Sequence, residues 1–211
     1  MIKKIFFIDI LDYRSSMPFK HAIVLTGGIA TGKSTSSQFL SQRGWHIIDA
    51  DKIAHEILDQ EHHTIAKMFG NAFVFQNKVD RKKLGGIIFA DPQAKKALED
   101  LLHPLIYQEI AHQSTLQDQK NSPYLIDIPL FFETQRYPIK KSILVYATPS
   151  QQLQRLMKRN NFTQQEAQQR INAQINIEHK RTLATYIIDN QSTLDALQAE
   201  CDRITNIIKQ S

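Results

Sequence analysis

The feature that most constrains the fold of this 211-residue chain is a glycine-rich stretch near its start. The stretch matches G-x-x-x-x-G-K-[ST] and reads Gly27-Gly28-Ile29-Ala30-Thr31-Gly32-Lys33-Ser34-Thr35. The apolar run at 22–26 before it is typical of a buried parallel strand, and the pattern at 34–43, which stops at Gly44, predicts a helix. A glycine turn between a strand and a helix N-terminus is suited to phosphate. The sequence therefore predicts an α/β fold that binds ATP or GTP.

The chemistry of this loop suggests a role for several of its residues. Backbone N–H groups would surround the β-phosphate, and the Lys33 ammonium would bridge the β- and γ-phosphates, which makes Lys33 a candidate catalytic residue. The Ser34 hydroxyl would coordinate Mg²⁺, the expected cofactor. The predicted ATP-binding residues in the loop are Gly28, Ile29, Ala30, Thr31, Gly32, Lys33, Ser34 and Thr35.

The rest of the chain alternates strand and helix patterns. Buried-strand candidates lie at 45–48, 124–128, 142–147 and 186–188, and helical patterns at 53–58, 92–102 and 153–158 lie between them. This alternation predicts a doubly wound sheet of about five parallel strands flanked by helices. We expect His103-Pro104 to end the apolar helix at 92–102, where the histidine either has no ligand or serves a functional site.

Composition excludes several classes of protein. The chain is 42% hydrophobic and 22% charged, as in folded globular proteins, and no apolar run approaches the 18 residues needed to cross a membrane. Its net charge of +5 favours an anionic partner without indicating nucleic acid. A single cysteine, Cys201, excludes an internal disulfide and a thiolate metal site, so we expect a cytoplasmic protein. Residues 17–211 are predicted to form one domain, and 1–16 is either an extension or an overlong start, with no function assigned.

Three carboxylates lie at the carboxyl ends of predicted strands, where ligands bind in open α/β sheets. Asp51 is the candidate general base for transfer of a phosphoryl group to an alcohol, with a helix N-cap as the alternative. For the neighbouring Asp49 the N-cap is the favoured interpretation. Asp127 ends the apolar run at 124–126 and is the candidate acid for holding Mg²⁺, directly or through water.

The segment 134–186 has a net positive charge larger than the surplus of +5 for the whole chain. It contains nine Lys or Arg residues and two Glu, and Thr163-Gln164-Gln165-Glu166 within it predicts a helix start, so we expect a basic helical hairpin before the last strand. Arg155 and Arg159 share a helix face and could close over a triphosphate as a lid. An RNA-binding patch is the alternative, disfavoured because no aromatic residue interleaves with the basic cluster. Asn190, after the last strand, either tightens a turn or contacts adenine.

In combination these residues resemble the dephospho-CoA kinase family over nearly the whole chain after Met17. The matching segments are Leu25 to Ile29, Asp49-Ala50-Asp51-Lys52-Ile53-Ala54, Val79-Asp80-Arg81 with Leu84, His103-Pro104, Asp127 to Glu133, Gln154 to Arg159, Arg170-Ile171 with Gln174, Lys180, and Asp189-Asn190. The phosphate loop is common to many nucleoside triphosphatases, whereas the order of the other segments is far more specific.

The resemblance implies a P-loop kinase core, a helical acceptor-binding region at about 60–120, and a lid at 151–181. It implies ATP-dependent phosphorylation of the ribose 3′-hydroxyl of dephospho-CoA, which gives coenzyme A and ADP in the last step of coenzyme A synthesis. The residue roles it implies are Asp51 as base, Arg159 as a catalytic contact to phosphate, Arg155 and Asn190 at ATP, and Arg81 and His103 at the acceptor.

The sequence departs from the family pattern at four positions. Ala30 and Asn77 stand where the family has glycine, His55 replaces an arginine, and Thr185 replaces an aspartate. Replacing glycine by alanine at position 30 costs little stability only if its φ is negative. Asparagine at position 77 tolerates a left-handed backbone. The alternatives to a dephospho-CoA kinase are another small-molecule or nucleoside-monophosphate-type kinase, or a nucleotide-dependent binding module without catalysis.

Overall fold

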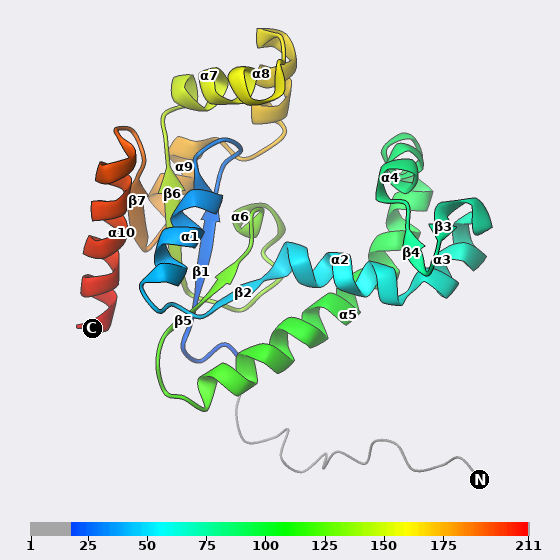
Figure 1. The fold of residues 1–211 in the computed structure, drawn as a ribbon, viewed down its shortest axis with the longest axis horizontal. Helices are drawn as coiled ribbons and strands as arrows, with labels where there is room; N and C mark the ends of the chain where they lie inside the picture. The colour runs from blue at the N-terminus through cyan, green and yellow to red at the C-terminus, as the bar shows by residue number, and fades with distance from the viewer. Residues whose placement is uncertain (1–17, 211) are drawn as a thin grey trace.

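The computed structural model describes residues 18–210. The segment 1–16 and the two end residues of the predicted domain, 17 and 211, lie outside the described part of the chain. Within it, five parallel strands form one sheet in the order β2-β5-β1-β6-β7 (Figure 1). The strands are β1 (Ala22–Gly27), β2 (Ile47–Asp49), β5 (Tyr124–Asp127), β6 (Lys141–Tyr146) and β7 (Tyr186–Asp189). The predicted α/β core of about five parallel strands is confirmed.

Helices cover both faces of the sheet because successive strand residues point to opposite sides. Val24 of β1 is buried in the cluster formed with α2 (Ala50–Gln60) and α5 (Pro92–Asp118). Its neighbours Ile23 and Leu25 are buried in the cluster formed with α1 (Lys33–Gln42) and α10 (Leu194–Lys209). Burial on both faces accounts for the continuous apolar run of β1.

The expected end of the helix at His103-Pro104 is wrong. Helix α5 runs for 27 residues, through Pro104 to Asp118. Pro104 itself is exposed, while Ile110 and Ala111 beyond it are buried against the sheet. An interior proline costs about 3 kcal/mol in helix stability. Burial of the apolar face that continues after it offsets this cost.

A small lobe with its own apolar cluster lies at the far end of α2 and α5 from the sheet (Figure 1). It comprises α3 (His62–Phe69), a 3₁₀ turn (Asn71–Phe73), the antiparallel pair β3 (Val74–Phe75) and β4 (Lys78–Val79), and α4 (Arg81–Ala90). Asn77 in the β3–β4 turn has φ 61°, which an asparagine tolerates. The lobe is therefore mainly helical, with a short hairpin that the sequence analysis did not anticipate.

The basic segment between β6 and β7 folds into three helices, of which the first two lie beyond the end of β1 and the third packs against β6 (Figure 1). They are α7 (Pro149–Asn160), α8 (Gln164–Asn172) and α9 (Ile177–Leu183), and the short α6 (Phe131–Thr134) follows β5. The Thr163–Glu166 capping box is confirmed, and Asn161, with φ 53°, separates α7 from α8. We call residues 151–181 the lid, the role that the family resemblance predicts for them.

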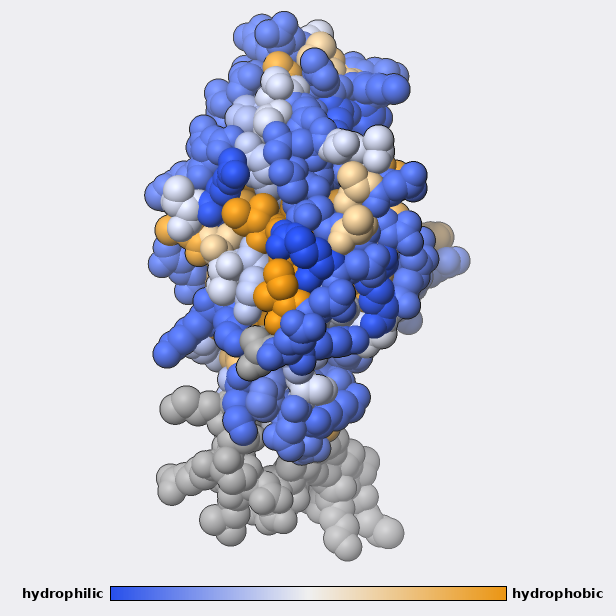
Figure 2. Space-filling model, turned by 90° about the vertical axis from the view of Figure 1, so that its left-hand side faces the viewer, coloured by the Kyte–Doolittle hydropathy of each residue, from blue (hydrophilic) through white to orange (hydrophobic). Residues whose placement is uncertain are grey.

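The described helices include none with the length and apolar character to span a membrane. Figure 2 shows the face on the side of α10, where hydrophobic residues form small groups separated by hydrophilic ones.

Candidate active site

The phosphate loop turns sharply between β1 and α1. Gly32 has φ 93°, and a Cβ at this position would collide with the side-chain amide of Asn190, so only glycine fits. Ala30 has φ 61°, the positive sign that makes alanine costly here. The N–H groups at the start of α1 face the space beyond the loop, as a phosphate site requires.

Two cavities meet beside this loop. The first, of about 870 Å³, is lined by residues 27–35 and by Asp51, Pro129, Arg155, Lys158, Arg159 and Gln174. The second, of about 460 Å³, has walls that include His103, Tyr107, Arg136 and Tyr137. Asp51, Pro129 and Gln174 line both. The structure thus brings together the predicted loop residues, the candidate base and both lid arginines, and places His103 in the adjoining cavity.

The two aspartates after β2 have different environments. Asp49 caps α2, because its Oδ1 accepts a hydrogen bond of 2.9 Å from the Lys52 N–H, and this prediction is confirmed. Asp51 lies in the first turn of α2 and is exposed, and its carboxylate takes part in no hydrogen bond among residues 18–210. Its carboxylate is therefore available at the junction of the cavities, and its role as base stays a prediction.

Asp127, at the end of β5, forms an ion pair with the Lys33 ammonium. Burial raises the pKa of the Asp127 carboxyl above its ordinary value, Lys33 opposes the rise, and the charges of Asp49 and Asp51 add to it. Three carboxylates and one lysine therefore share the edge of the sheet. Such a group attracts a cation, which would relieve the repulsion among the acids.

The lid arginines are held differently. Arg155 Nη2 donates to the backbone oxygen of Asn190 at 2.8 Å, while its Nη1 is buried without a partner in the described chain. Arg159 is exposed and donates through Nε to Asn160 Oδ1 at 2.9 Å. An orphaned guanidinium nitrogen in the wall of a phosphate-loop cavity fits an anionic ligand.

The structure separates Asn190 and Arg81 from the open cavities. The buried Asn190 donates through Nδ2 to Thr31 O at 2.7 Å, so its amide supports the phosphate loop rather than facing the cavity. Arg81 lies on α4 in the small lobe, with Nη2 3.4 Å from Asp59 Oδ2, and lines neither cavity. Their predicted contacts to adenine and to the acceptor therefore stay predictions.

The second cavity has an aromatic wall. Tyr107 and Tyr137 stack with ring centroids 5.6 Å apart and an interplanar angle of 14°. Burial raises the pKa of Tyr137 to about 12, so its hydroxyl stays neutral. Burial and the nearby Arg136 lower the pKa of His103, which keeps its imidazole neutral at pH 7. The cavity combines flat apolar surface with neutral hydrogen-bonding groups and one arginine.

Comparison with known proteins agrees with this geometry. The family model for dephospho-CoA kinase matches residues 21–196. A dephospho-CoA kinase of Sulfurimonas denitrificans is 50% identical over 193 residues, which cover 92% of this chain and 96% of that protein. One from Helicobacter pylori is 43% identical, covering 89% and 97%. This chain belongs to the dephospho-CoA kinase family.

A solved structure shows that the family fold is shared as well. The dephospho-CoA kinase from Campylobacter jejuni superposes with a TM-score of 0.70 at 34% identity, over 90% of this chain and 98% of that one. The chain is accordingly an ATP-dependent kinase with the P-loop kinase core that the resemblance implied.

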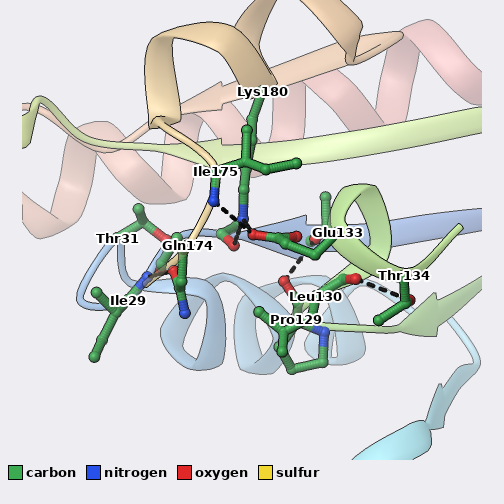
Figure 3. A network of polar contacts seen from close by, with 12 residues as sticks. Ile29, Thr31, Pro129, Leu130, Glu133, Thr134, Gln174, Ile175 and Lys180 are labelled. Carbon is green, nitrogen blue, oxygen red and sulfur yellow. Dashed lines mark hydrogen bonds and ion pairs between the residues drawn. The ribbon is translucent and has the colours of Figure 1, made fainter. Parts of the chain in front are cut away.

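Several side chains contact the phosphate loop in ways that the sequence did not predict (Figure 3). Gln152 Nε2 donates to Ile29 O at 2.7 Å, and Gln174 Oε1 accepts from Ile29 N at 2.8 Å. Lys180, which is fully buried, forms a 2.6 Å ion pair with Glu133 and donates to Gly27 O at 3.2 Å. Gln174, Lys180 and Glu133 stood in the family pattern, but nothing in their spacing indicated these partners.

Proposed function

We propose that this chain transfers the γ-phosphoryl group of ATP to the ribose 3′-hydroxyl of dephospho-CoA, forming coenzyme A and ADP in the last step of coenzyme A synthesis. The observation that carries the proposal is the position of Asp51 on the wall shared by two cavities, one of them formed by the phosphate loop. The curated relatives, named dephospho-CoA kinase, support this choice of acceptor.

Asp51 acts as the general base. The acceptor hydroxyl binds between the cavities, its oxygen forms a bond to the γ-phosphorus, and its proton passes to the Asp51 carboxylate. The bond from that phosphorus to the bridging β-oxygen breaks, and ADP leaves. An exposed carboxylate free of other partners can accept this proton, and such proton transfer contributes about 10²–10⁴-fold to rate.

Ser34 and Asp127 are the residues that would hold Mg²⁺. Hard oxygen donors suit this ion, which binds through one or two carboxylates together with substrate phosphates, and the buried, repelled Asp127 carboxylate fits it. When bound, Mg²⁺ neutralises charge on the phosphates. Lys33 pairs with Asp127 in the structure, and we infer that its ammonium contacts the β- and γ-phosphates when ATP is present.

Arg155 and Arg159 supply positive charge from the lid. The buried Nη1 of Arg155 has no partner in the described chain, and we expect it to donate to a phosphate oxygen once movement of the lid exposes it to the cavity. Arg159, whose side chain is exposed at the cavity wall, contacts the transferred phosphoryl group when the lid closes. Closure also excludes water, which suppresses hydrolysis of ATP.

The acceptor occupies the second cavity. Its nucleobase packs on the Tyr107–Tyr137 stack, and neutral His103 hydrogen-bonds to the acceptor without adding charge. Arg81 contributes from the small lobe only if acceptor binding brings that lobe closer.

The proposal is tested by incubating the protein with Mg·ATP and a panel of alcohols that includes dephospho-CoA, nucleosides and nucleoside monophosphates. Dephospho-CoA should be phosphorylated preferentially. Faster turnover of a nucleoside or nucleotide would reject this acceptor, and hydrolysis of ATP with no acceptor phosphorylated would reject the kinase assignment.

A pair of matched variants tests the base. Asp51→Asn should lower kcat by about 10²-fold or more while Mg·ATP still binds. Asp49→Asn is the control, because asparagine retains the N-cap of α2 and removes a carboxylate two residues away, and its loss should be far smaller. Equal losses in the two variants would remove Asp51 from its role.

A further inference from the structure

Gln174 lies where the lid chain returns from α8 toward α9, at the junction of the two cavities. It shares this position with Asp51 and Pro129, since only these three residues of the described chain appear in both walls. A group at the junction faces both the nucleotide side and the acceptor side. The transferred phosphoryl group must pass through this space if the proposed function holds.

The orientation of the Gln174 amide follows from its partner. The Ile29 N–H, 2.8 Å away, can only donate, so the amide oxygen must face it and the amide nitrogen must lie on the other side. Figure 3 shows the nitrogen turned away from Ile29. Within residues 18–210 this nitrogen takes part in no hydrogen bond, so the junction holds two unused N–H donors.

The segment that carries Gln174 is anchored at two further points. The next residue, Ile175, donates its N–H to Glu133 Oε1 at 3.2 Å, and the buried Lys180 ammonium lies 2.6 Å from the same carboxylate (Figure 3). Lys180 also donates to Gly27 O, at the first residue of the phosphate loop. The amide is therefore held in place relative to the loop before any substrate binds, which is the condition for a donor to act in a transition state.

We propose that Gln174 is a catalytic residue that donates its Nε2–H to an oxygen of the phosphoryl group during transfer, a role that rests on the proposed function. The amide keeps its own proton throughout, while the acceptor proton passes to Asp51. A neutral donor suits a place beside Asp51, because a cation there would pair with the carboxylate and lower its affinity for the acceptor proton. Loss of one such preorganised donor lowers kcat about 10²–10³-fold in other enzymes.

Two substitutions separate donation from support of the loop. Gln174→Met removes both the donor and the acceptor of the Ile29 N–H, whereas Gln174→Glu keeps the acceptor and removes the donor. Both variants should lower kcat with dephospho-CoA by about 10²-fold, with KM for ATP and for the acceptor changed only a few-fold. Gln165→Met is the matched control, an exposed glutamine of the same lid that lines neither cavity, and should turn over like the wild type.

Wild-type kcat in Gln174→Glu would overturn the proposal and leave only a supporting contact to Ile29. A raised KM for ATP at unchanged kcat would also overturn it, since donation in the transition state acts on kcat. A Mg·ATP-induced rise in Tm shows that a variant folds and binds. Failure of the wild type itself to phosphorylate dephospho-CoA counts against the proposed function instead, so the two failures are distinct.

Discussion

The ion pair between the buried Lys180 and the partly buried Glu133 offers a test of how the lid is tied to the phosphate loop. Lys180 is 0% exposed, and Glu133 Oε2 is buried without a partner in the described chain, so the ammonium is the only cation near this carboxylate there. Lys180→Met leaves a buried charge uncompensated, which costs about 3–5 kcal/mol. In a domain of this size, each kcal/mol of lost stability lowers Tm by about 2–4 °C, so the expected drop in Tm is about 6–20 °C.

A double-mutant cycle separates this cost from lost packing. In Lys180→Met with Glu133→Gln both charges are gone, and the glutamine oxygen can still accept from Ile175 N, so the double variant should regain most of the lost stability. Urea unfolding at pH 7.5 measures all four proteins. Lys96→Met, which breaks an exposed pair with Asp100, is the control and should shift the midpoint little. A double variant whose loss equals the sum of the single losses would refute the reasoning.

Three further predictions concern buried groups. Gly32→Ala forces a Cβ into the Asn190 amide at φ 93°, so it should abolish the rise in Tm that Mg·ATP causes, and a retained rise would contradict this. Because burial raises the folded-state pKa of Asp127, ionisation above that pKa lowers stability, and Asp127→Asn should raise Tm relative to wild type more at pH 8 than at pH 4; equal shifts at both pH values would count against it. Burial raises the pKa of Cys201 to about 11, so iodoacetamide at pH 8 should label it only after addition of urea, and rapid labelling of the folded protein would show the thiol is accessible.

The elements that the sequence predicted well are those governed by local rules. The loop at 27–35 lies between a strand and a helix because glycine turns and apolar runs act within a few residues. The Asp49 cap and the Thr163 capping box follow from a side chain and a backbone N–H three residues apart. The predicted site residues Asp51, Arg155 and Arg159 meet in one cavity because each follows from its place at the edge of the sheet or on one helix face.

Features that depend on distant packing were not predictable in this way. Pro104 argued locally for a helix end, yet the helix continues because Ile110 and Ala111 gain burial against strands more than ten residues away in sequence. The two-residue strands β3 and β4 are too short for any periodicity to show. The sequence predicted that Asn190 contacts adenine or tightens a turn. In the structure it hydrogen-bonds to Thr31, a residue 159 positions away in the chain.

The hydrogen bonds to Ile29 show why a sequence motif identifies the residues of a site but not the interactions that stabilise it. Both backbone groups of Ile29 are occupied by glutamine side chains, Gln152 near the start of the lid and Gln174 near its return. Ala30, the next residue, has φ 61°, which costs alanine about 1–2 kcal/mol. Two hydrogen bonds of about 0.5–1.5 kcal/mol each offset that cost. Alanine in place of glycine at position 30 is therefore tolerated because the lid stabilises the loop. Movement of the lid must also change the hydrogen bonds to Ile29 that offset the backbone strain at Ala30.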